Sequence, residues 1–160
     1  MRVHIVVVSD RCYRGEETDR SGALLKREFE KAGYLTVLDI VPDEQAEIRK
    51  ILAGSTGNVL LTSGGTGVGP RDVTPEACAA LIVKELPGIS HLITQKSLEQ
   101  TPFAAFGRGK AGLTARNQLL VNLPGSTKAA SLAAEILLPL LPHFFDQLGG
   151  KGAKGKYVEH

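Results

Sequence analysis

The stretch NVLLTSGGTGVGPRD, residues 58–72, holds a short apolar run followed by four glycines within six positions. Asn58–Thr62 is typical of a strand that is buried on both faces of a sheet. The segment after the glycines, Thr74-Pro75-Glu76, predicts a helix with Thr74 as N-cap and Pro75 in its first turn. A glycine turn between a strand end and a helix start is where open α/β sheets bind anions, because backbone N–H groups can approach the ligand there.

Two familiar phosphate-binding motifs do not fit these glycines. Gly64 and Gly69 have the spacing of a P-loop, but Pro70-Arg71 stands where the motif needs Lys and Ser or Thr. The dinucleotide fingerprint fails as well, because its third glycine would fall on Pro70. The sequence therefore supports neither an ordinary P-loop NTPase nor a Rossmann dehydrogenase. A turn that only connects strand and helix is the alternative.

Strand and helix patterns alternate along the chain. Further apolar runs predict strands at Val3–Val8, Val37–Val41 and Gln118–Asn122. Helices are expected at Ser21–Ala32, at Asp43–Leu52, from Thr74 to before Pro87, and over Ser126–Leu148, the last split or kinked by its two prolines. This alternation indicates α/β architecture with a mostly parallel sheet, in one domain over residues 1–148 and a flexible tail over 149–160. Residues 89–116 give no clear pattern.

Composition narrows the class of protein. The 160 residues carry a net charge of only +2, which is too small for the basic surface of a nucleic-acid binder. The two cysteines form no disulfide framework or zinc motif. The apolar run at the N-terminus is too short for a signal peptide, and no stretch approaches the ~20 apolar residues of a membrane span. A cytoplasmic protein is expected.

Polar residues follow the predicted strands at Ser9-Asp10, at Asp43, at Asp72 and at 122–126. The carboxyl ends of parallel strands meet at one edge of a sheet, where ligands bind. Carboxylates beside a phosphate cradle suit Mg²⁺, which one or two carboxylates and substrate phosphate usually hold. The alternatives are that Asp43 is a helix N-cap and that Asp72 only favours the following helix terminus. Four basic residues could pair with phosphate or be solvated surface charges: Arg71, Arg108, Lys110 and Arg116.

Seven segments in order resemble the MogA/MoaB family of molybdenum-cofactor biosynthesis proteins. The resemblance covers roughly residues 3–148 and rests on Val8-Ser9-Asp10, Asp19-Arg20-Ser21-Gly22, Val41-Pro42-Asp43-Glu44, Thr62-Ser63-Gly64-Gly65-Thr66-Gly67, Arg71-Asp72-Val73-Thr74-Pro75-Glu76, Pro87-Gly88 and Asn122-Leu123-Pro124-Gly125-Ser126. It implies a three-layer α/β/α molybdopterin-binding fold, assembled as a homotrimer. For the MogA branch it implies a molybdopterin adenylyltransferase that uses Mg²⁺ and ATP to make adenylyl-molybdopterin and pyrophosphate. The molybdate-inserting enzyme of the same pathway is an expected partner.

The resemblance also assigns roles to residues. Asp43 and Asp72 match two aspartates important for catalysis, and we expect both to hold Mg²⁺. The expected substrate-binding residues are Ser9, Asp10, Thr62, Ser63, Gly64, Gly65, Thr66, Gly67, Gly69, Arg71, Pro124, Gly125 and Ser126. One departure stands out: Gly107-Arg108 replaces a Ser-Arg pair of many relatives, which removes one hydroxyl.

Three other functions compete with the adenylyltransferase. A MoaB-like protein would bind molybdopterin without adenylylating it, and the shared motifs do not separate the two branches. A hydrolase of nucleotide pyrophosphates would need a water-activating acid or His cluster, which the sequence does not show. A scaffold for later pathway enzymes would bind through its surface. The segments Leu141-Pro142-His143 and Tyr157-Val158-Glu159 resemble the MogA branch and favour the enzyme.

Overall fold

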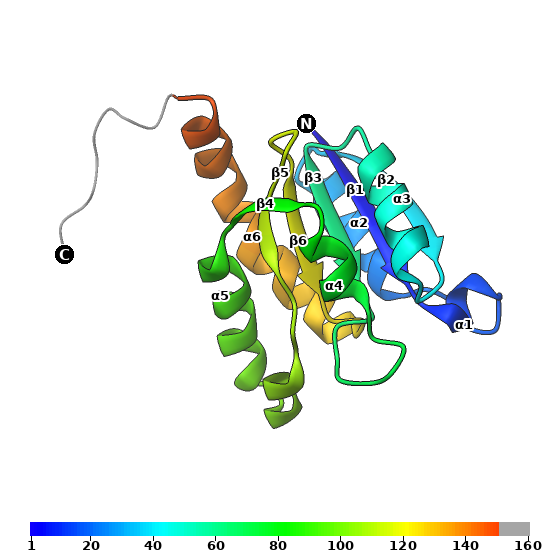
Figure 1. The fold of residues 1–160 in the computed structure, drawn as a ribbon. Coiled ribbons are helices and arrows are strands. Elements are labelled where there is room, and N and C mark those ends of the chain that lie inside the picture. The colour runs from blue at the N-terminus through cyan, green and yellow to red at the C-terminus, as the bar shows by residue number, and fades with distance from the viewer. Residues whose placement is uncertain (151–160) are drawn as a thin grey trace.

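The computed structural model describes residues 1–150, which form a six-stranded sheet in the order β2-β1-β3-β6-β5-β4 (Figure 1). Four strands run parallel: β1 (Arg2–Val8), β2 (Leu35–Val41), β3 (Val59–Ser63) and β6 (Leu119–Leu123). The other two, β4 (Ile82–Glu85) and β5 (Ala111–Thr114), are antiparallel to their neighbours. The mostly parallel sheet predicted from the sequence is confirmed. From residue 151 onward, the expected tail lies outside the described residues.

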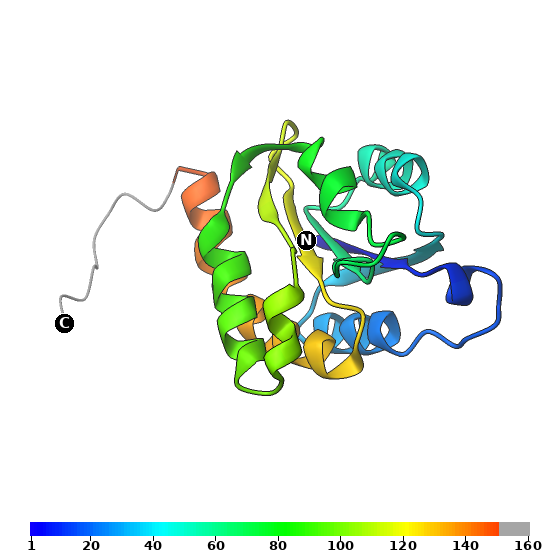
Figure 2. The same cartoon turned by 60° about the horizontal axis from the view of Figure 1, so that its bottom comes forward.

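Helices cover both faces of this sheet (Figure 2). On one face α2 (Ser21–Lys31), α5 (Pro87–Leu98) and α6 (Thr127–Leu148) share an apolar core with β1, β3, β5 and β6. On the other face α3 (Gln45–Gly54) and α4 (Thr74–Ala79) share a second core with β1, β2, β3 and β6. The short α1 (Asp10–Tyr13) and the 3₁₀ helix η1 (Pro102–Phe106) complete the described elements. The three-layer α/β/α arrangement implied by the resemblance is confirmed.

Burial on both faces explains why the sequences of the central strands do not alternate between apolar and polar residues. Every residue of β3 and β6 is buried, as are all residues of β1 after Arg2, because helices cover both faces. The strand β2 lies at the sheet edge, and its residues alternate between exposed and half-buried, apart from the buried Val41. All four predicted strands are present, with bounds that differ by one or two residues.

The helix expected from Thr74 to Pro87 is wrong in its length and in its cap. The helix α4 ends at Ala79, and the chain then forms the antiparallel strand β4. Val73 occupies the N-cap position without a side-chain bond, while the Thr74 hydroxyl donates to the Gly64 carbonyl at 2.9 Å. The short and mostly exposed β4 carries no alternation strong enough to distinguish it from its helical neighbours.

Of the two forms expected for residues 126–148, two helices or one kinked helix, the first is wrong. One continuous helix, α6, spans Thr127–Leu148 with Pro139 and Pro142 inside it. Both prolines are exposed, so water can bond the carbonyls that their missing N–H groups leave free. By length and composition alone α6 could cross a membrane, contrary to the sequence-based expectation. Its buried residues, which include Ala130, Ala133 and Leu137, pack in the core, and we interpret α6 as a core helix.

The order of the strands indicates where a ligand would bind. From β1 the chain first adds β2 on one side and then β3 on the other, so the direction of winding reverses at β1. Open α/β sheets bind ligands beyond the carboxyl ends of strands at such a reversal. The registers Val8 to Val41 and Ser63 to Leu123 bring the four parallel strands to the same edge.

Candidate functional site

The glycine loop, defined here as Gly64–Asp72, leaves β3 through two residues in the left-handed region. Gly64 has φ of 106° and Gly65 has φ of 66°, which L side chains rarely adopt. A Cβ on Gly64 would collide with the Val8 carbonyl oxygen. The loop therefore needs glycine at both positions to pass so close to the end of β1.

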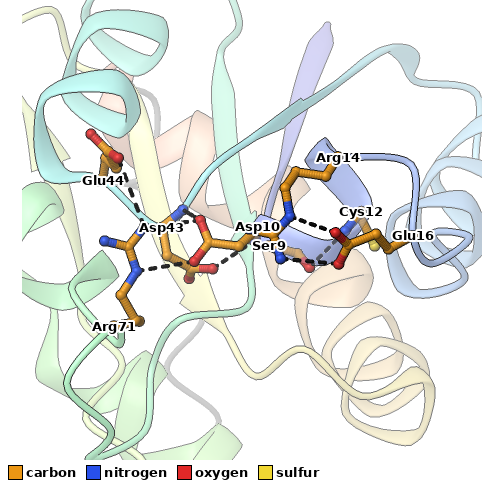
Figure 3. Close-up of polar contacts among 8 residues, drawn as sticks. All are labelled: Ser9, Asp10, Cys12, Arg14, Glu16, Asp43, Glu44 and Arg71. Atoms are coloured by element: carbon orange, nitrogen blue, oxygen red, sulfur yellow. Dashed lines mark hydrogen bonds and ion pairs between the residues drawn. The ribbon is translucent and has the colours of Figure 1, made fainter.

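Asp10 and Asp43 join the ends of β1 and β2 by exchanging hydrogen bonds (Figure 3). The Asp10 backbone N–H donates to Oδ2 of Asp43 at 2.8 Å, and the Asp43 N–H donates to Oδ1 of Asp10 at 3.0 Å. The carboxylate of Asp43 is thus directed toward β1 rather than toward α3. The N-cap position of α3 is held by Glu44, so the interpretation of Asp43 as a helix cap is wrong.

Arg71 of the glycine loop contacts residues that follow the same two strands, β1 and β2. Its Nε donates to Oδ2 of Asp10 and its Nη2 to Oδ1, both at 3.0 Å, while Glu44 lies 3.8 Å from Nη2 (Figure 3). The Arg71 guanidinium, together with the Asp43 N–H, lowers the pKa of Asp10 below its ordinary 3.8. The Arg71 charge is therefore matched by Asp10, and the bidentate pair fastens the loop to β1.

Asp43 differs from Asp10 in its electrostatic environment. Burial raises the pKa of Asp43 above 3.8, and the Asp10 and Asp72 carboxylates add to the rise. No hydrogen bond reaches Oδ1 of Asp43 from the residues that the structure describes. That oxygen faces the glycine loop, because a Cβ on Gly65 would lie 3.0 Å from it.

Asp72 ends the glycine loop and folds back into it. Its Oδ2 accepts the Gly69 N–H at 2.8 Å, and its side chain lines a cavity beside the loop. Asp43 and Asp72 thus flank the loop with a carboxylate oxygen each that is free of hydrogen bonds within residues 1–150. No group of three or more His, Cys, Asp or Glu side chains is arranged for a metal in the same residues. A cation here would need oxygen atoms from a ligand as well.

Two cavities open on either side of the loop's first residue. The α5 cavity, about 530 Å³, is lined by the glycine loop, by α5 and η1, and by the start of α6. The α2 cavity, about 510 Å³, is lined by the end of β1, by Cys12 of α1 and by residues 17–21 at the start of α2. Both cavities share Gly64, Gly125 and Ser126. Ligands in the two cavities would meet at these three residues.

Two of the shared residues, Gly125 and Ser126, lie at the start of α6. The Ser126 hydroxyl oxygen accepts the Ala129 N–H at 3.1 Å and so caps the helix. This terminus of a 22-residue helix faces the junction of the cavities, and its dipole favours negative charge there. The junction is suited to a phosphate group.

The structure places most of the predicted site residues around the cavities. Those that line at least one cavity are Ser9, Ser63, Gly64, Gly65, Thr66, Gly67, Asp72, Pro124, Gly125 and Ser126. Five others lie outside both linings: Asp10, Thr62, Gly69 and Arg71 as supports, and Asp43 beneath Gly65. Thr62 is fully buried, and its hydroxyl accepts the Asn122 side-chain amide at 3.0 Å.

The sequence did not predict that α5 and η1 form one wall of the α5 cavity. The α5 cavity is bordered there by Ser90, Thr94, Gln100, Thr101 and Phe103. The one usable signal is Thr101-Pro102, since a hydroxyl followed by proline marks a helix start, and the Thr101 side chain does cap η1. Gly107 also lines this cavity, at the position where the sequence departs from the family pattern.

A doubly wound α/β fold with a glycine loop, two carboxylates and a helix N-terminus at its topological switch defines a class of protein that binds phosphorylated ligands. Within that class, residues 4–143 match the family model described as "Probable molybdopterin binding domain". The chain belongs to this family of molybdenum-cofactor biosynthesis proteins.

Curated relatives agree on the pathway but differ in length. The chain is 42% identical over 151 residues to the molybdenum cofactor synthesis protein cinnamon of Drosophila melanogaster, covering 91% of this chain and 25% of that protein. It is 39% identical to molybdenum cofactor biosynthesis protein B of Bacillus cereus, covering 92% of this chain and 90% of the relative. It is 33% identical to the molybdopterin adenylyltransferase of Helicobacter pylori, covering 92% and 89%. The chain spans a quarter to a half of several relatives, among them a bifunctional protein of Chlorobaculum tepidum at 49%.

Solved structures share the whole fold. A crystal structure of the molybdopterin biosynthesis enzyme MoaB from Thermus thermophilus has a TM-score of 0.84 at 39% identity, with 96% of this chain and 99% of that chain covered. A structure of MogA has a TM-score of 0.87 at 31% identity, with 92% and 99% covered. The resemblance to both branches, stated from the sequence, is confirmed.

Proposed function

We propose that the chain is a molybdopterin adenylyltransferase, which joins molybdopterin to the adenylyl group of ATP. The observation that carries the proposal is the pair of cavities that meet at Gly64, Gly125 and Ser126, with Asp43 and Asp72 beside the loop. A reaction that joins two phosphorylated substrates needs two binding volumes with a common phosphate position. The name of the Helicobacter pylori relative supports the same reaction.

The reaction needs no nucleophile from the protein. An oxygen of the terminal phosphate of molybdopterin attacks the α-phosphorus of ATP, and the bond from that phosphorus to the bridging oxygen breaks. Pyrophosphate leaves with the electron pair of that bond. Positioning and neutralisation of charge supply most of the catalysis in such transfers. In this chain the N–H groups of the glycine loop and the α6 terminus would hold the shared phosphate position.

Mg²⁺ fits the donor set that the two aspartates offer. Asp43 Oδ1 and one Asp72 oxygen are free of hydrogen bonds within the described residues, and substrate phosphates would complete the coordination. When bound, Mg²⁺ neutralises phosphate charge and favours the leaving of pyrophosphate. Asp72 would hold the cation at the α5 cavity, with Asp43 assisting from the end of β2.

The remaining sequence-based expectations are part of the proposal. We expect a homotrimer, a cytoplasmic location and an association with the molybdate-inserting enzyme of the pathway. Relatives named as bifunctional, such as that of Chlorobaculum tepidum, support a link to a further step. Sedimentation of the purified chain tests the trimer directly.

A molybdopterin-binding protein without transfer activity is the second candidate. It is favoured by the identity of 39% to protein B of Bacillus cereus, against 33% to the named adenylyltransferase. The glycine loop and the α5 cavity would serve such a protein equally well. In such a protein the carboxylates of Asp43 and Asp72 would have no catalytic role.

One experiment separates the two candidates. The chain is incubated with molybdopterin, ATP and Mg²⁺, and pyrophosphate is measured together with binding of molybdopterin. The proposed enzyme releases one pyrophosphate for each adenylyl-molybdopterin formed and releases none without molybdopterin. Tight binding of molybdopterin with no pyrophosphate selects the binding protein. Pyrophosphate release that does not depend on molybdopterin points instead to a nucleotide pyrophosphate hydrolase.

A further inference from the structure

Arg108 lies between η1 and β5 and reaches across to the glycine loop. Its backbone N–H donates to the Thr66 carbonyl at 3.0 Å. Its Nε donates to the Gly67 carbonyl at 2.7 Å, and its Nη2 donates to the Asp72 carbonyl at 2.8 Å. Arg108 therefore bonds three carbonyl oxygens of one loop, rather than facing solvent or a phosphate as the sequence suggested.

The same guanidinium is fixed from its other side. Nη1 of Arg108 pairs with Glu76 in α4, and this contact lowers the pKa of Glu76. The planar fork of arginine can satisfy several acceptors at fixed angles, which a lysine ammonium cannot do. Arg108 thus bridges the glycine loop to the first turn of α4.

The loop is otherwise held mainly at its ends, where Thr74 bonds the carbonyls of Gly64 and Gly65 and Arg71 pairs with Asp10. Its glycines offer no side chains to pack, and ordering glycine costs more backbone entropy than ordering any other residue. The Asp72 carboxylate is held by Gly69, and the Asp72 carbonyl is held by Arg108. Arg108 lines neither the α5 cavity nor the α2 cavity, so it would act through the loop.

We propose that Arg108 is a positioning residue that holds the glycine loop and Asp72 in the geometry required for adenylyl transfer. The catalytic part of this inference rests on the proposed function, and the ordering of the loop does not. Because Gly107 beside it lines the α5 cavity, Arg108 also connects the segment that follows η1 to the backbone of Asp72, whose carboxylate would hold Mg²⁺.

The test compares Arg108→Gln and Arg108→Lys with a matched control, Arg116→Gln. Arg116 also donates to two backbone carbonyls, those of Ala53 at 2.8 Å and Ser55 at 2.5 Å, but it does so in the turn before β6. Both arginines thus link backbone segments, and only one of them reaches the glycine loop. Loss of stability alone would affect all three variants.

Amide hydrogen exchange of the 64–72 segment gives a readout independent of activity. We expect both Arg108 variants to exchange there about tenfold faster than the parent chain, with Arg116→Gln unchanged, since local opening governs exchange. Unchanged exchange in the Arg108 variants overturns the proposal. If Arg108→Gln does not fold, Arg108→Lys keeps the charge and decides the outcome in the same way.

Kinetics give the second readout. We expect kcat of both Arg108 variants to fall about 100-fold, as displacement of a positioned group by about 1 Å can cause. The KM for Mg²⁺ should rise more than the KM for molybdopterin, since Asp72 is displaced with the loop while the part of the α5 cavity formed by α5 and η1 is unchanged. A smaller fraction of folded enzyme would change neither KM. Guanidinium ions should partly restore Arg108→Gly and have no such effect on Arg116→Gly.

The two hypotheses fail in different ways. If the parent chain releases no pyrophosphate, the proposed function fails, and the exchange measurement still judges the ordering role of Arg108. If the parent is active and Arg108→Lys matches it in kcat and in exchange, the positioning role is wrong while the enzyme assignment stands.

Discussion

The parallel half of the sheet, β2-β1-β3-β6, and the antiparallel half, β5 and β4, form the site in different ways (Figure 1). The parallel strands end at one edge and carry the glycine loop, Asp43 and Asp72. The antiparallel half carries α5 and η1, which line the α5 cavity with neutral and aromatic side chains such as Thr94 and Phe103. The charged groups and the neutral ligand wall thus come from separate parts of the fold. Substitutions of the carboxylates and of the side chains in the ligand wall should therefore change different constants.

The largest effect is expected for Asp72→Asn in the parallel half. The amide keeps the size of the side chain and can still accept the Gly69 N–H, but it removes the charge that would hold Mg²⁺. We expect kcat to fall by about 100-fold or more, the range found for a lost electrostatic group, with molybdopterin affinity nearly unchanged. Pyrophosphate release and molybdopterin binding are measured on the same sample. If kcat and the affinity for molybdopterin fell by equal factors, the separation of the charged groups from the ligand wall would be contradicted.

Asp43→Asn should have the next largest effect and a distinctive pH dependence. Burial raises the pKa of Asp43 above 3.8, so the parent enzyme should lose activity as the pH falls through that raised pKa and the carboxylate takes up a proton. We expect the variant to lose about tenfold or more in kcat and to lack this acidic limb. The pH profile of kcat for both proteins is the measurement. An unchanged acidic limb in the variant would assign it to another group.

Phe103→Ala tests the wall in the antiparallel half. Phe103 is 74% exposed and borders the α5 cavity, so it can stack on a flat ring of a bound ligand. We expect the dissociation constant of molybdopterin to rise about fivefold, from a stacking contribution of about 1 kcal/mol, while kcat changes little. Phe106→Ala is the matched control, since Phe106 is 59% exposed and does not line that cavity. Equal effects of both variants would remove the argument for stacking.

Asp10→Ala tests whether the ends of β1 and β2 depend on their shared hydrogen bonds. The change removes the acceptor of Arg71 and of the Asp43 N–H, and we expect a loss of about 1–3 kcal/mol in the free energy of unfolding. Because the pKa of Asp10 is lowered in the folded chain, its contribution is present above 3.8 and is lost as the pH falls through the lowered value. Urea titrations at neutral and acidic pH measure both effects. Glu16→Gln, in an exposed pair with Arg14, should change little.

The smallest effect concerns the two thiols. Burial raises the pKa of Cys78 to about 12, so this thiol should not react with a thiol reagent in the folded chain, while the partly exposed Cys12 should. Cys12 lines the α2 cavity, so a ligand there should slow its labelling severalfold. Mass spectrometry of the chain labelled with and without ATP measures how many thiols have reacted and identifies them. Labelling of Cys78 at the rate of Cys12 would contradict the buried position.

How well each strand can be predicted from the sequence also differs between the parallel and the antiparallel half of the sheet. The strands β1, β3 and β6 are buried on both faces, and their unbroken apolar runs identify them with small errors at the ends. The strand β4 is short and mostly exposed, and it shifts register against β5, so no local pattern indicates it. The path of α6 through Pro139 and Pro142 depends on the core beneath it, which offsets the cost of the prolines.

The fold class, the family, the glycine loop and the convergence of strand ends can be predicted from the sequence, because each depends on local residue type or on the order of elements. The three-dimensional arrangement established that Asp10 is paired with Arg71 while Asp43 keeps an oxygen toward the loop. It also decided that Arg108 bonds the loop instead of a phosphate. The physical reason is that a charged side chain acts through the partners within its reach, and those partners here come from segments more than thirty residues away.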